Sequence, residues 1–428
     1  MNYKIETQVL HAGSQIDETG SRGVPLHRTS AYMFKNTEHA ANLFALKELG
    51  NIYTRLQNPT QDVLEQRVAA LEGGAAALAL SSGTSAIFYT IINVCGAGDE
   101  VVSSSSLYGG TYTMFNNILP EMGIKVRFVE EGSPEAFEAA VTDRTRMFFT
   151  EVIGNPSLDV VNISAIAEVA KKHHVPLAVD STFTTPFLFR PLEHGADIVI
   201  HSLTKWLGGH GVGLGGIVVD SGKFDWTDPK FRLFNEPDAS YHDLRYALDL
   251  GELSPLAFIL RMRLVPLRNL GACISPDNAW MFLQGIETLP LRMERHCSNA
   301  LAVAKYLQKH PRVSWVRYPG LPEDPSYSAA AKQLENGFGG MIVFGVKGVG
   351  RSDREAGEVF INNLQLISHL ANVGDAKSLA IHPASTTHSQ MNEDQQRAGG
   401  ITPDMVRLSV GIEHLDDILH DLNSALNS

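Results

Sequence analysis

Two short apolar segments, each followed by polar residues, constrain the fold of this chain most strongly. Residues 175–179 read Val-Pro-Leu-Ala-Val and lead to Asp180, and residues 196–200 read Ala-Asp-Ile-Val-Ile and lead to Lys205 within His-Ser-Leu-Thr-Lys. Such runs, rich in β-branched residues and bounded by breakers, are typical of strands buried on both faces. In open α/β sheets the ligand crevice lies outside the carboxyl ends of the strands. We therefore expect Asp180 and Lys205 to face one crevice.

A lysine and an aspartate in such a crevice have two interpretations. A partly desolvated lysine near other cations has its pKa lowered toward a neutral amine that can form a Schiff base. Pyridoxal phosphate needs such an amine, and it needs a carboxylate that keeps its pyridine nitrogen protonated. Ser202 and Thr204 add hydroxyls suited to a phosphate ester. The alternative is an exposed lysine in a Gly-rich loop and an aspartate that caps a helix, and these residues alone leave both open.

Length and charge limit the classes of protein. A chain of 428 residues is too long for one simple core, and its net charge of -12, without a Lys/Arg-rich run, argues against nucleic-acid binding. Three widely spaced cysteines (Cys95, Cys273 and Cys297) make neither a disulfide framework nor a zinc site, so we expect a reducing compartment. The first residues lack a basic region followed by an apolar one, so we expect no signal peptide and a cytoplasmic protein.

The uncharged stretch from Gly73 to Gly98 is long enough to span a bilayer, but Ser81 to Ser85 interrupt its centre. Strand, loop and helix is the better interpretation. A small-residue turn there (Ser81, Ser82, Gly83 and Thr84), between a strand at 76–80 and a helix, predicts an anion site. Such turns also occur simply as tight connections.

The order of elements predicts an α/β fold. Strands are expected at 100–103, 126–129 and 147–152, with helices at 134–141 and 164–172 between them, which favours a mostly parallel sheet. Long helical spacing at 277–308, broken near Pro290, leads to a smaller α+β C-terminal domain. We assign residues 1–60 to an N-terminal arm, 61–285 to a large domain and 286–428 to the small domain.

Several polar residues outside the two strands are candidates for the site. Tyr108 follows the strand at 100–103 and could stack on a flat ring. Arg407 lies within a strand-like apolar run and needs an anionic partner, either a protein carboxylate or a substrate. Tyr53 and Arg55 close the arm, where they either dock on another subunit or belong to a surface loop. Residues 224–260 form a long aromatic-bearing insertion, as lids and pocket walls often do.

Other motifs predict little. Residues 211–216 match G-x-G-x-x-G, but they precede an apolar run instead of joining a strand to a helix, so a dinucleotide site is not expected. The sixteen histidines, His382 and His388 among them, show no metal-ligand spacing. We therefore expect no metal.

The chain as a whole resembles the cystathionine/methionine-metabolism family of pyridoxal-phosphate enzymes, which have the aspartate-aminotransferase fold (fold type I). Eight ordered motifs carry the resemblance over nearly the whole chain: YTRLQNPT from Tyr53, SSGTSA from Ser81, LYGGTY from Leu107, EVIGNP from Glu151, AVDST from Ala178, HSLTKWLGGHG from His201, GDAKSLAIHPASTTHS from Gly374 and VRLSVGIEH from Val406.

The resemblance implies a role for each matching residue. Lys205 would form the Schiff base, Asp180 would pair with the pyridine nitrogen, and Tyr108 would stack on the ring and is a candidate acid or base. Asn155 would bind the phenolic oxygen, and Arg407 would bind the substrate α-carboxylate. The phosphate would be held by Ser82, Gly83, Thr84, Ser202 and Thr204, with Tyr53 and Arg55 from a neighbouring subunit.

Within the family the chain resembles the branch that replaces the acetoxy group of O-acetyl-L-homoserine with sulfide or methanethiol. The insertion after the lysine motif, Asn372 where lyases commonly have serine, and Gly110 where methionine γ-lyases usually have cysteine carry this resemblance. Asn372 and Tyr53 would then contact the substrate. Expected partners are small molecules and further copies of the chain in a homotetramer, without nucleic acid or membrane. The alternatives are a cystathionine γ-synthase and a methionine or cystathionine γ-lyase.

Overall fold

Two β-sheets organise the chain in the computed structural model, which describes residues 3–14, 16–130, 132–387, 389, 392, 396 and 400–428. His388 lies outside the described residues. The larger sheet has seven strands in the order β1-β7-β6-β5-β4-β2-β3. β7 runs antiparallel to β1 and β6, and the other neighbours are parallel. The strands are β1 (Ala76–Leu80), β2 (Glu100–Ser104), β3 (Lys125–Val129), β4 (Thr145–Glu151), β5 (Leu177–Asp180), β6 (Ile198–Ser202) and β7 (Gly216–Asp220).

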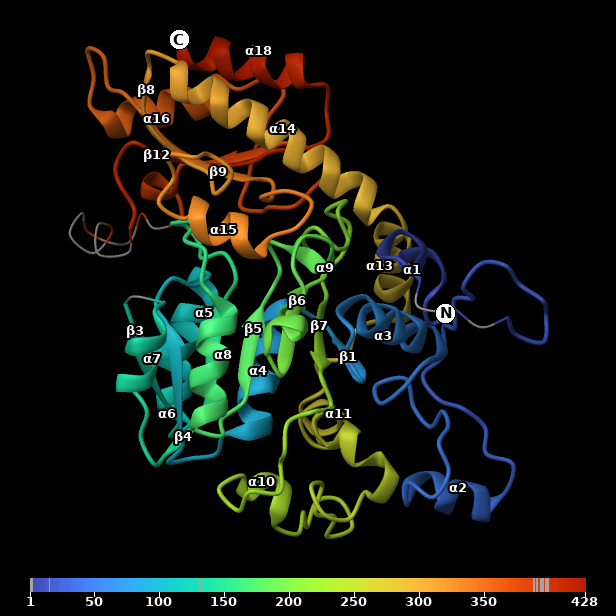
Figure 1. Ribbon diagram of the computed structural model, residues 1–428. Helices are drawn as coiled ribbons and strands as arrows, with labels where there is room; N and C mark the ends of the chain where they lie inside the picture. Colours follow the sequence, from blue (N-terminus) through green and yellow to red (C-terminus); the bar gives the residue numbers. More distant parts are fainter. Residues whose placement is uncertain are drawn as a thin grey trace.

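Helices cover both faces of the larger sheet (Figure 1). Alternate residues of β6 enter two different cores, since Val199 packs with α3 and α8 whereas Ile198 and Ile200 pack with α4 and α11. Burial on both faces explains the continuous apolar strands. The helices of these layers are α3 (Pro59–Glu72), α4 (Gly83–Val94), α8 (Ile163–Lys172), α11 (Ala257–Met262) and α13 (Pro276–Glu287). The expected mostly parallel sheet is confirmed.

The smaller sheet forms a second domain, as expected. Its five strands lie in the order β10-β11-β12-β9-β8, and only β10 and β11 are parallel. The strands are β8 (Val313–Arg317), β9 (Met341–Val346), β10 (Ser368–His369), β11 (Leu379–Ile381) and β12 (Met405–Ser409), and the covering helices are α14 (Leu289–Lys309), α16 (Asp353–Asn362) and α18 (Leu415–Leu426). Figure 1 shows α14 running from the large domain onto this sheet.

Shorter helical segments complete the chain. They are α1 (Ile5–His11), α2 (Thr37–Phe44), α5 (Gly109–Thr113), α6 (Leu119–Glu121), α7 (Pro134–Ala139), α9 (Thr185–Leu188), α10 (Arg232–Asn235), α12 (Arg268–Leu270) and α15 (Tyr327–Gln333). Two π-helical segments (Met114–Ile118 and Arg263–Leu267) and three 3-10 segments (Pro191–His194, Gly251–Leu256 and Pro383–Ser385) lie between them. The expected helix at 277–308 is two helices that divide at Thr288, which places Pro290 in a first turn, where proline is tolerated.

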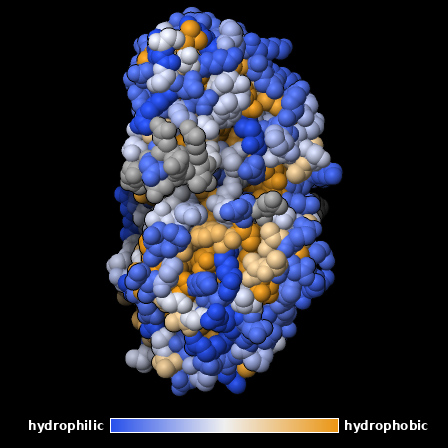
Figure 2. Space-filling view, turned by 90° about the vertical axis from the view of Figure 1, so that its left-hand side faces the viewer, coloured by the Kyte–Doolittle hydropathy of each residue, from blue (hydrophilic) through white to orange (hydrophobic). Residues whose placement is uncertain are grey.

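Polar residues cover most of the face seen in Figure 2, and apolar residues gather near its middle. No helix of the described chain has both the length and the apolar character that crossing a membrane requires.

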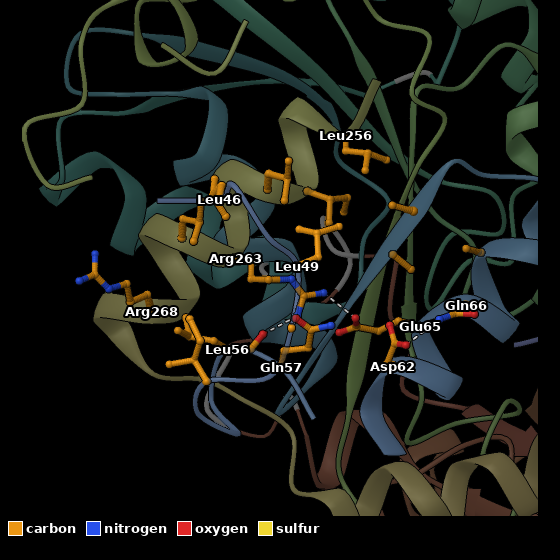
Figure 3. Close-up of a pocket in the computed structure, with 18 of the residues that line it drawn as sticks. Leu46, Leu49, Leu56, Gln57, Asp62, Glu65, Gln66, Leu256, Arg263 and Arg268 are labelled. Carbon is orange, nitrogen blue, oxygen red and sulfur yellow. Dashed lines mark hydrogen bonds and ion pairs between the residues drawn. The ribbon is translucent and has the colours of Figure 1, made fainter. Parts of the chain in front are cut away.

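The insertion after β7 packs at the far end of the large domain, where Figure 1 shows α10 away from the small domain. Its aromatic residues are packed together, with Trp226 stacked on Phe234 at 4.3 Å between ring centroids. It forms a pocket wall, as expected, but of a cavity of about 430 Å³ that it shares with residues 43–57 of the arm (Figure 3). In that cavity Arg263 pairs with Glu65. Lys205 and Asp180 are not among its lining residues.

Two aspartates are buried at the same end of the sheet. Asp197 precedes β6 and accepts a hydrogen bond from the Leu177 N–H at 2.9 Å, and Asp220 ends β7 opposite Ile198. Burial raises the pKa of Asp197 to about 6, and burial with the charge of Asp197 raises the pKa of Asp220 to about 7. The folded protein thus holds protons that the unfolded chain releases at lower pH.

We expect Asp220→Asn to remove part of the pH dependence of stability. Between about pH 4 and 7 folded Asp220 keeps its proton while the unfolded side chain ionises, so stability falls by up to about 1.4 kcal/mol per pH unit as pH rises. Relative to wild type, the variant should gain stability from pH 5 to pH 8 in thermal melts. Asp143→Asn, at an exposed position, is the control. A difference that stays constant with pH would contradict the assignment.

Candidate active site

The carboxyl ends of the parallel strands bring the predicted residues to one edge of the larger sheet. Asp180 ends β5, Glu151 ends β4 directly opposite it, and Ser202 ends β6. Lys205 lies in the turn that follows β6, and its N–H donates to the Ser202 carbonyl at 3.2 Å. The edge faces the smaller sheet, whose strand β12 carries Arg407. Side chains from both parts of the chain meet at this edge, since Lys205 bonds to Asn372 and Arg407 bonds to Asn155, and we refer to this region as the crevice.

The Lys205 amine is partly buried and lies beside another cation. Its Nζ donates a hydrogen bond to Asn372 Oδ1, so the structure brings these two predicted residues together. Burial, and then the positive charge of Arg407, lower the pKa of Lys205 to about 8. At pH 7 roughly a tenth of the amine is therefore neutral, far more than for an ordinary lysine. A neutral amine is the form that can attack a carbonyl or accept a proton.

Asp180 belongs to a buried pair of carboxyl groups. Burial raises the pKa of Asp180, while hydrogen bonds from Thr182 oppose that rise; the Thr182 N–H donates to Asp180 Oδ1 at 2.9 Å. Burial and the charge of Asp180 raise the pKa of Glu151 well above its ordinary value. We infer that Glu151 keeps the proton and Asp180 carries the negative charge, because Asp180 is the better hydrogen-bonded of the two.

Tyr108 and Arg407 converge on the same crevice. The Tyr108 N–H donates to Glu151 Oε1 at 2.7 Å, and its side chain is 52% exposed. Gly110 lies under the ring, since a Cβ there would come within 2.6 Å of Tyr108 Cε1. The Arg407 guanidinium donates to Asn155 Oδ1 at 3.2 Å. Burial lowers the pKa of Arg407, and the nearby Tyr108 opposes the effect.

A second cluster forms a cup at the start of α4. Ser82 caps the helix by accepting the Ser85 N–H at 3.0 Å, so its hydroxyl is already engaged. Among the described residues, the N–H groups of Gly83 and Thr84 have no protein acceptor and are free to bind an anion. Ser202 closes the cup, since a Cβ on Gly83 would lie 2.7 Å from its Cβ. The Thr204 hydroxyl accepts the Gly215 N–H at 3.1 Å.

The glycine-rich segment 208–216 is explained by close packing. It precedes β7, as the sequence indicates, and Gly216 approaches the cup so closely that a Cβ would lie 2.1 Å from the Ser82 carbonyl oxygen. Gly209, at φ +72, adjoins the Arg292 guanidinium. These glycines allow backbone segments to approach each other.

Tyr53 and Arg55 are not joined to this crevice within the single chain. The Arg55 guanidinium lies 5.1 Å from the centre of the Tyr53 ring, and among the described residues neither side chain hydrogen-bonds to the cup or to Lys205. Tyr53 is 40% exposed. Their expected place beside a neighbouring subunit stays a prediction.

Two residues of the crevice were missed as candidates. Glu151 lies within one of the quoted motifs, and its role depends on its register with Asp180. The Thr182 hydroxyl accepts the Ser202 N–H at 2.9 Å and so ties the end of β6 to the turn after Asp180. Position at the end of a neighbouring parallel strand is the signal that indicates Glu151.

Comparison with known proteins places these features in context. The family model described as Cys/Met metabolism PLP-dependent enzyme matches residues 6–427. An O-acetyl-L-homoserine sulfhydrylase of Leptospira meyeri is 55% identical, over 100% of this chain and 97% of its own length. A homocysteine synthase of Schizosaccharomyces pombe is 49% identical, over 99% of this chain and 98% of its own length.

A solved structure has the same fold. A proposed O-acetylhomoserine (thiol)-lyase of Campylobacter jejuni matches with a TM-score of 0.94 and 39% identity, and the match covers 100% of both chains. That protein carries N'-pyridoxyl-lysine-5'-monophosphate at its position 205. The expected aspartate-aminotransferase-like fold, with a large and a small domain, is confirmed.

The proximity of the two cations gives a test in the cofactor-free protein. Arg407→Ala removes a positive charge, so the pKa of Lys205 should rise from about 8 toward its ordinary value of 10.5. Arg407→Lys keeps the charge and should leave the pKa of Lys205 near 8. The measurement is the pH dependence of acetic-anhydride labelling, read by peptide mass spectrometry with exposed Lys125 as reference. Equal labelling midpoints in both variants would exclude the electrostatic coupling.

Proposed function

The chain belongs to the Cys/Met metabolism PLP-dependent enzyme family, and on that basis we propose that it catalyses the sulfhydrylation of O-acetyl-L-homoserine. In this reaction sulfide, or methanethiol, replaces the acetoxy group at the γ-carbon. The products are L-homocysteine, or L-methionine, and acetate. The cofactor is pyridoxal phosphate. The observation that carries the proposal is a partly buried Lys205 amine that is hydrogen-bonded to Asn372 and whose pKa is lowered by burial and by the charge of Arg407.

The residues present fit the cofactor. A Cβ on Gly83 would fill the cup, and the free N–H groups at the start of α4 suit a phosphate. The Ser202 and Thr204 hydroxyls lie at the same place. Asp180 would supply the carboxylate that keeps the pyridine nitrogen protonated, Tyr108 would stack on the ring, and Asn155 would bind the phenolic oxygen. When bound, pyridoxal phosphate supplies an electron sink for negative charge that develops on the substrate.

Arg407 and Lys205 orient and activate the amino acid. Arg407 forms a bidentate pair with the α-carboxylate, for which its fork of donors is suited. The negative charge of the α-carboxylate also offsets the repulsion between Arg407 and Lys205. Lys205, as a neutral amine, then removes the proton from the α-carbon. Asn372 holds the amine in place through its side-chain oxygen, and we assign it to the substrate pocket with Tyr53.

Proton transfers at the side chain complete the replacement. Lys205 then releases the α-proton to solvent, and the neutral amine accepts a proton from the β-carbon. The bond between the γ-carbon and the acetoxy oxygen breaks, and its electron pair leaves with acetate. Sulfide then adds at the γ-carbon, and protons return to the β-carbon and the α-carbon to give homocysteine. We assign Tyr108 as the candidate acid or base that exchanges protons with Lys205 or with the leaving group.

We further propose that the active site is shared between subunits of a homotetramer in the cytoplasm. Residues 1–60 form the arm, which would bring Tyr53 and Arg55 to the phosphate of a neighbouring subunit, while 61–285 and 286–428 form the two domains. The exposed apolar side chains of the arm, with Met33 at 96% and Leu49 at 68%, support a partner. The three free cysteines fit a reducing compartment.

A substrate panel tests the function. With O-acetyl-L-homoserine, acetate release should require sulfide and should yield equal amounts of homocysteine. O-succinyl and O-phospho homoserine should react poorly, and cysteine should be a poor acceptor in place of sulfide or methanethiol. Acetate release without any thiol, accompanied by 2-oxobutyrate, would instead identify a γ-lyase. Preference for cysteine would identify a cystathionine γ-synthase.

Asp180→Asn should separate cofactor binding from catalysis. The variant keeps the hydrogen bond from Thr182 but loses the charge that holds the pyridine proton, so exchange of the substrate α-proton should fall by roughly 100-fold or more. The measurement is deuterium incorporation at the α-carbon by NMR, with bound cofactor quantified by absorbance. Thr182→Val is the comparison, because it removes a hydrogen bond to Asp180 but keeps the carboxylate, so exchange should fall less than in Asp180→Asn. Undiminished exchange in Asp180→Asn would exclude the assigned role.

A further inference from the structure

One buried arginine outside the crevice is attached to the turn that carries Lys205. Arg292 lies in the first turn of α14 and donates to the Trp206 carbonyl oxygen at 2.8 Å and to that of Leu207 at 3.3 Å. It also donates to the Gly285 carbonyl oxygen at 2.7 Å, at the end of α13. The two residues after Lys205 are therefore hydrogen-bonded to a helix that leads into the small domain.

The environment of Arg292 is costly to maintain. Its side chain is buried, and no ion pair among the described residues involves it. Burial alone lowers the pKa of Arg292 to about 10, so it remains a cation held by carbonyl oxygens. Burying a charge without a carboxylate partner costs free energy, which hydrogen bonds to the charged group must offset.

The same helix is attached to the strand that carries Arg407. One turn beyond Arg292, His296 donates from Nδ1 to the Val410 carbonyl oxygen at 2.6 Å, and burial lowers the pKa of His296 to about 4, so the ring is neutral. Asn299 donates to the carbonyl oxygens of Gly411 at 3.1 Å and Glu413 at 3.0 Å. These acceptors begin three residues after Arg407.

We propose that α14 sets the position of the Lys205 amine relative to the Arg407 guanidinium, with Arg292 as the positioning residue for the lysine turn and Asn299, with His296, for the arginine strand. Arg292, His296 and Asn299 lie on one face of the helix because they are spaced by four and three residues. Lys205 follows a strand of the larger sheet and Arg407 lies on a strand of the smaller sheet, so neither sheet alone fixes their separation. The inference rests on the proposed function in one respect: it takes Lys205 and Arg407 to act on the same substrate.

Hydrogen exchange in the cofactor-free protein tests the attachments independently of the reaction. Arg292→Met should increase exchange of the amides at 203–209 and leave 408–413 unchanged, whereas Asn299→Ala should do the reverse. Arg295→Met and Ser298→Ala change exposed neighbours on the same helix and should leave both segments unchanged. Exchange in Arg292→Met equal to that in Arg295→Met would overturn the proposal.

Kinetics of the holoenzyme should separate the two ends. Arg292→Met should lower kcat by about 100-fold and move the pH at which the visible spectrum titrates, because small displacements of a reacting group cost that much. Its KM for O-acetyl-L-homoserine should stay within about twofold. Asn299→Ala should raise that KM by about tenfold, the effect of a lost hydrogen bond that orders Arg407, without moving the spectral titration.

Arg292→Lys provides a milder variant in case Arg292→Met does not fold. A single ammonium cannot reach all three carbonyl oxygens with the geometry of a guanidinium, so kcat should be intermediate and KM unchanged. Parallel changes of kcat, KM and spectrum in the Arg292 and Asn299 variants would mean that α14 is only structural, which overturns the proposal. If the wild-type protein does not act on O-acetyl-L-homoserine, the proposed function fails. The amide hydrogen-exchange experiment still decides the role of α14.

Discussion

The placement of two cations side by side in a buried crevice is the constraint on which the rest of the site depends. The Lys205 amine and the Arg407 guanidinium repel each other, and burial adds to the cost of charging both. This cost lowers the pKa of Lys205 to about 8, so the lysine loses its proton at a lower pH than an ordinary lysine does. In the proposed function, the same arrangement would attract an amino-acid carboxylate to Arg407, beside an amine that gives up its proton more readily than an ordinary lysine. The repulsion that disfavours a charged Lys205 in the free protein thus favours the neutral amine, which is the reactive form.

The architecture keeps these groups in place from two directions. Parallel strands of the larger sheet bring Asp180, Glu151 and Ser202 to one edge, and β12 of the smaller sheet supplies Arg407. Hydrogen bonds join the lysine turn to the small domain. Arg292 donates to the Trp206 carbonyl oxygen, and Lys205 donates to Asn372. Because Glu151 keeps its proton, the pair carries a single negative charge, on Asp180.

Local sequence predicts the parts of the site that depend on strand ends and turns. Asp180 and Lys205 follow apolar runs, and the cup at Gly83 follows β1. The sequence therefore predicts all three at the ends of strands. Glu151 was missed because its importance arises from register with β5, which is set by tertiary pairing. Arg292 was missed because its partners are backbone atoms about 86 positions away. The predicted place of Tyr53 and Arg55 at the phosphate site would need a second chain. The packing position of the insertion depends on the folded sheet.

Reduction of the holoenzyme with borohydride tests the central claim most directly. Borohydride fixes the bond between pyridoxal phosphate and the amine that carries it, and peptide mass spectrometry then locates the modified lysine. The account predicts one modified peptide, which contains Lys205, and none in Lys205→Ala. A modified peptide that lacks Lys205, or no modification at all in a protein shown to contain the cofactor, would contradict the assignment and the chemistry built on it.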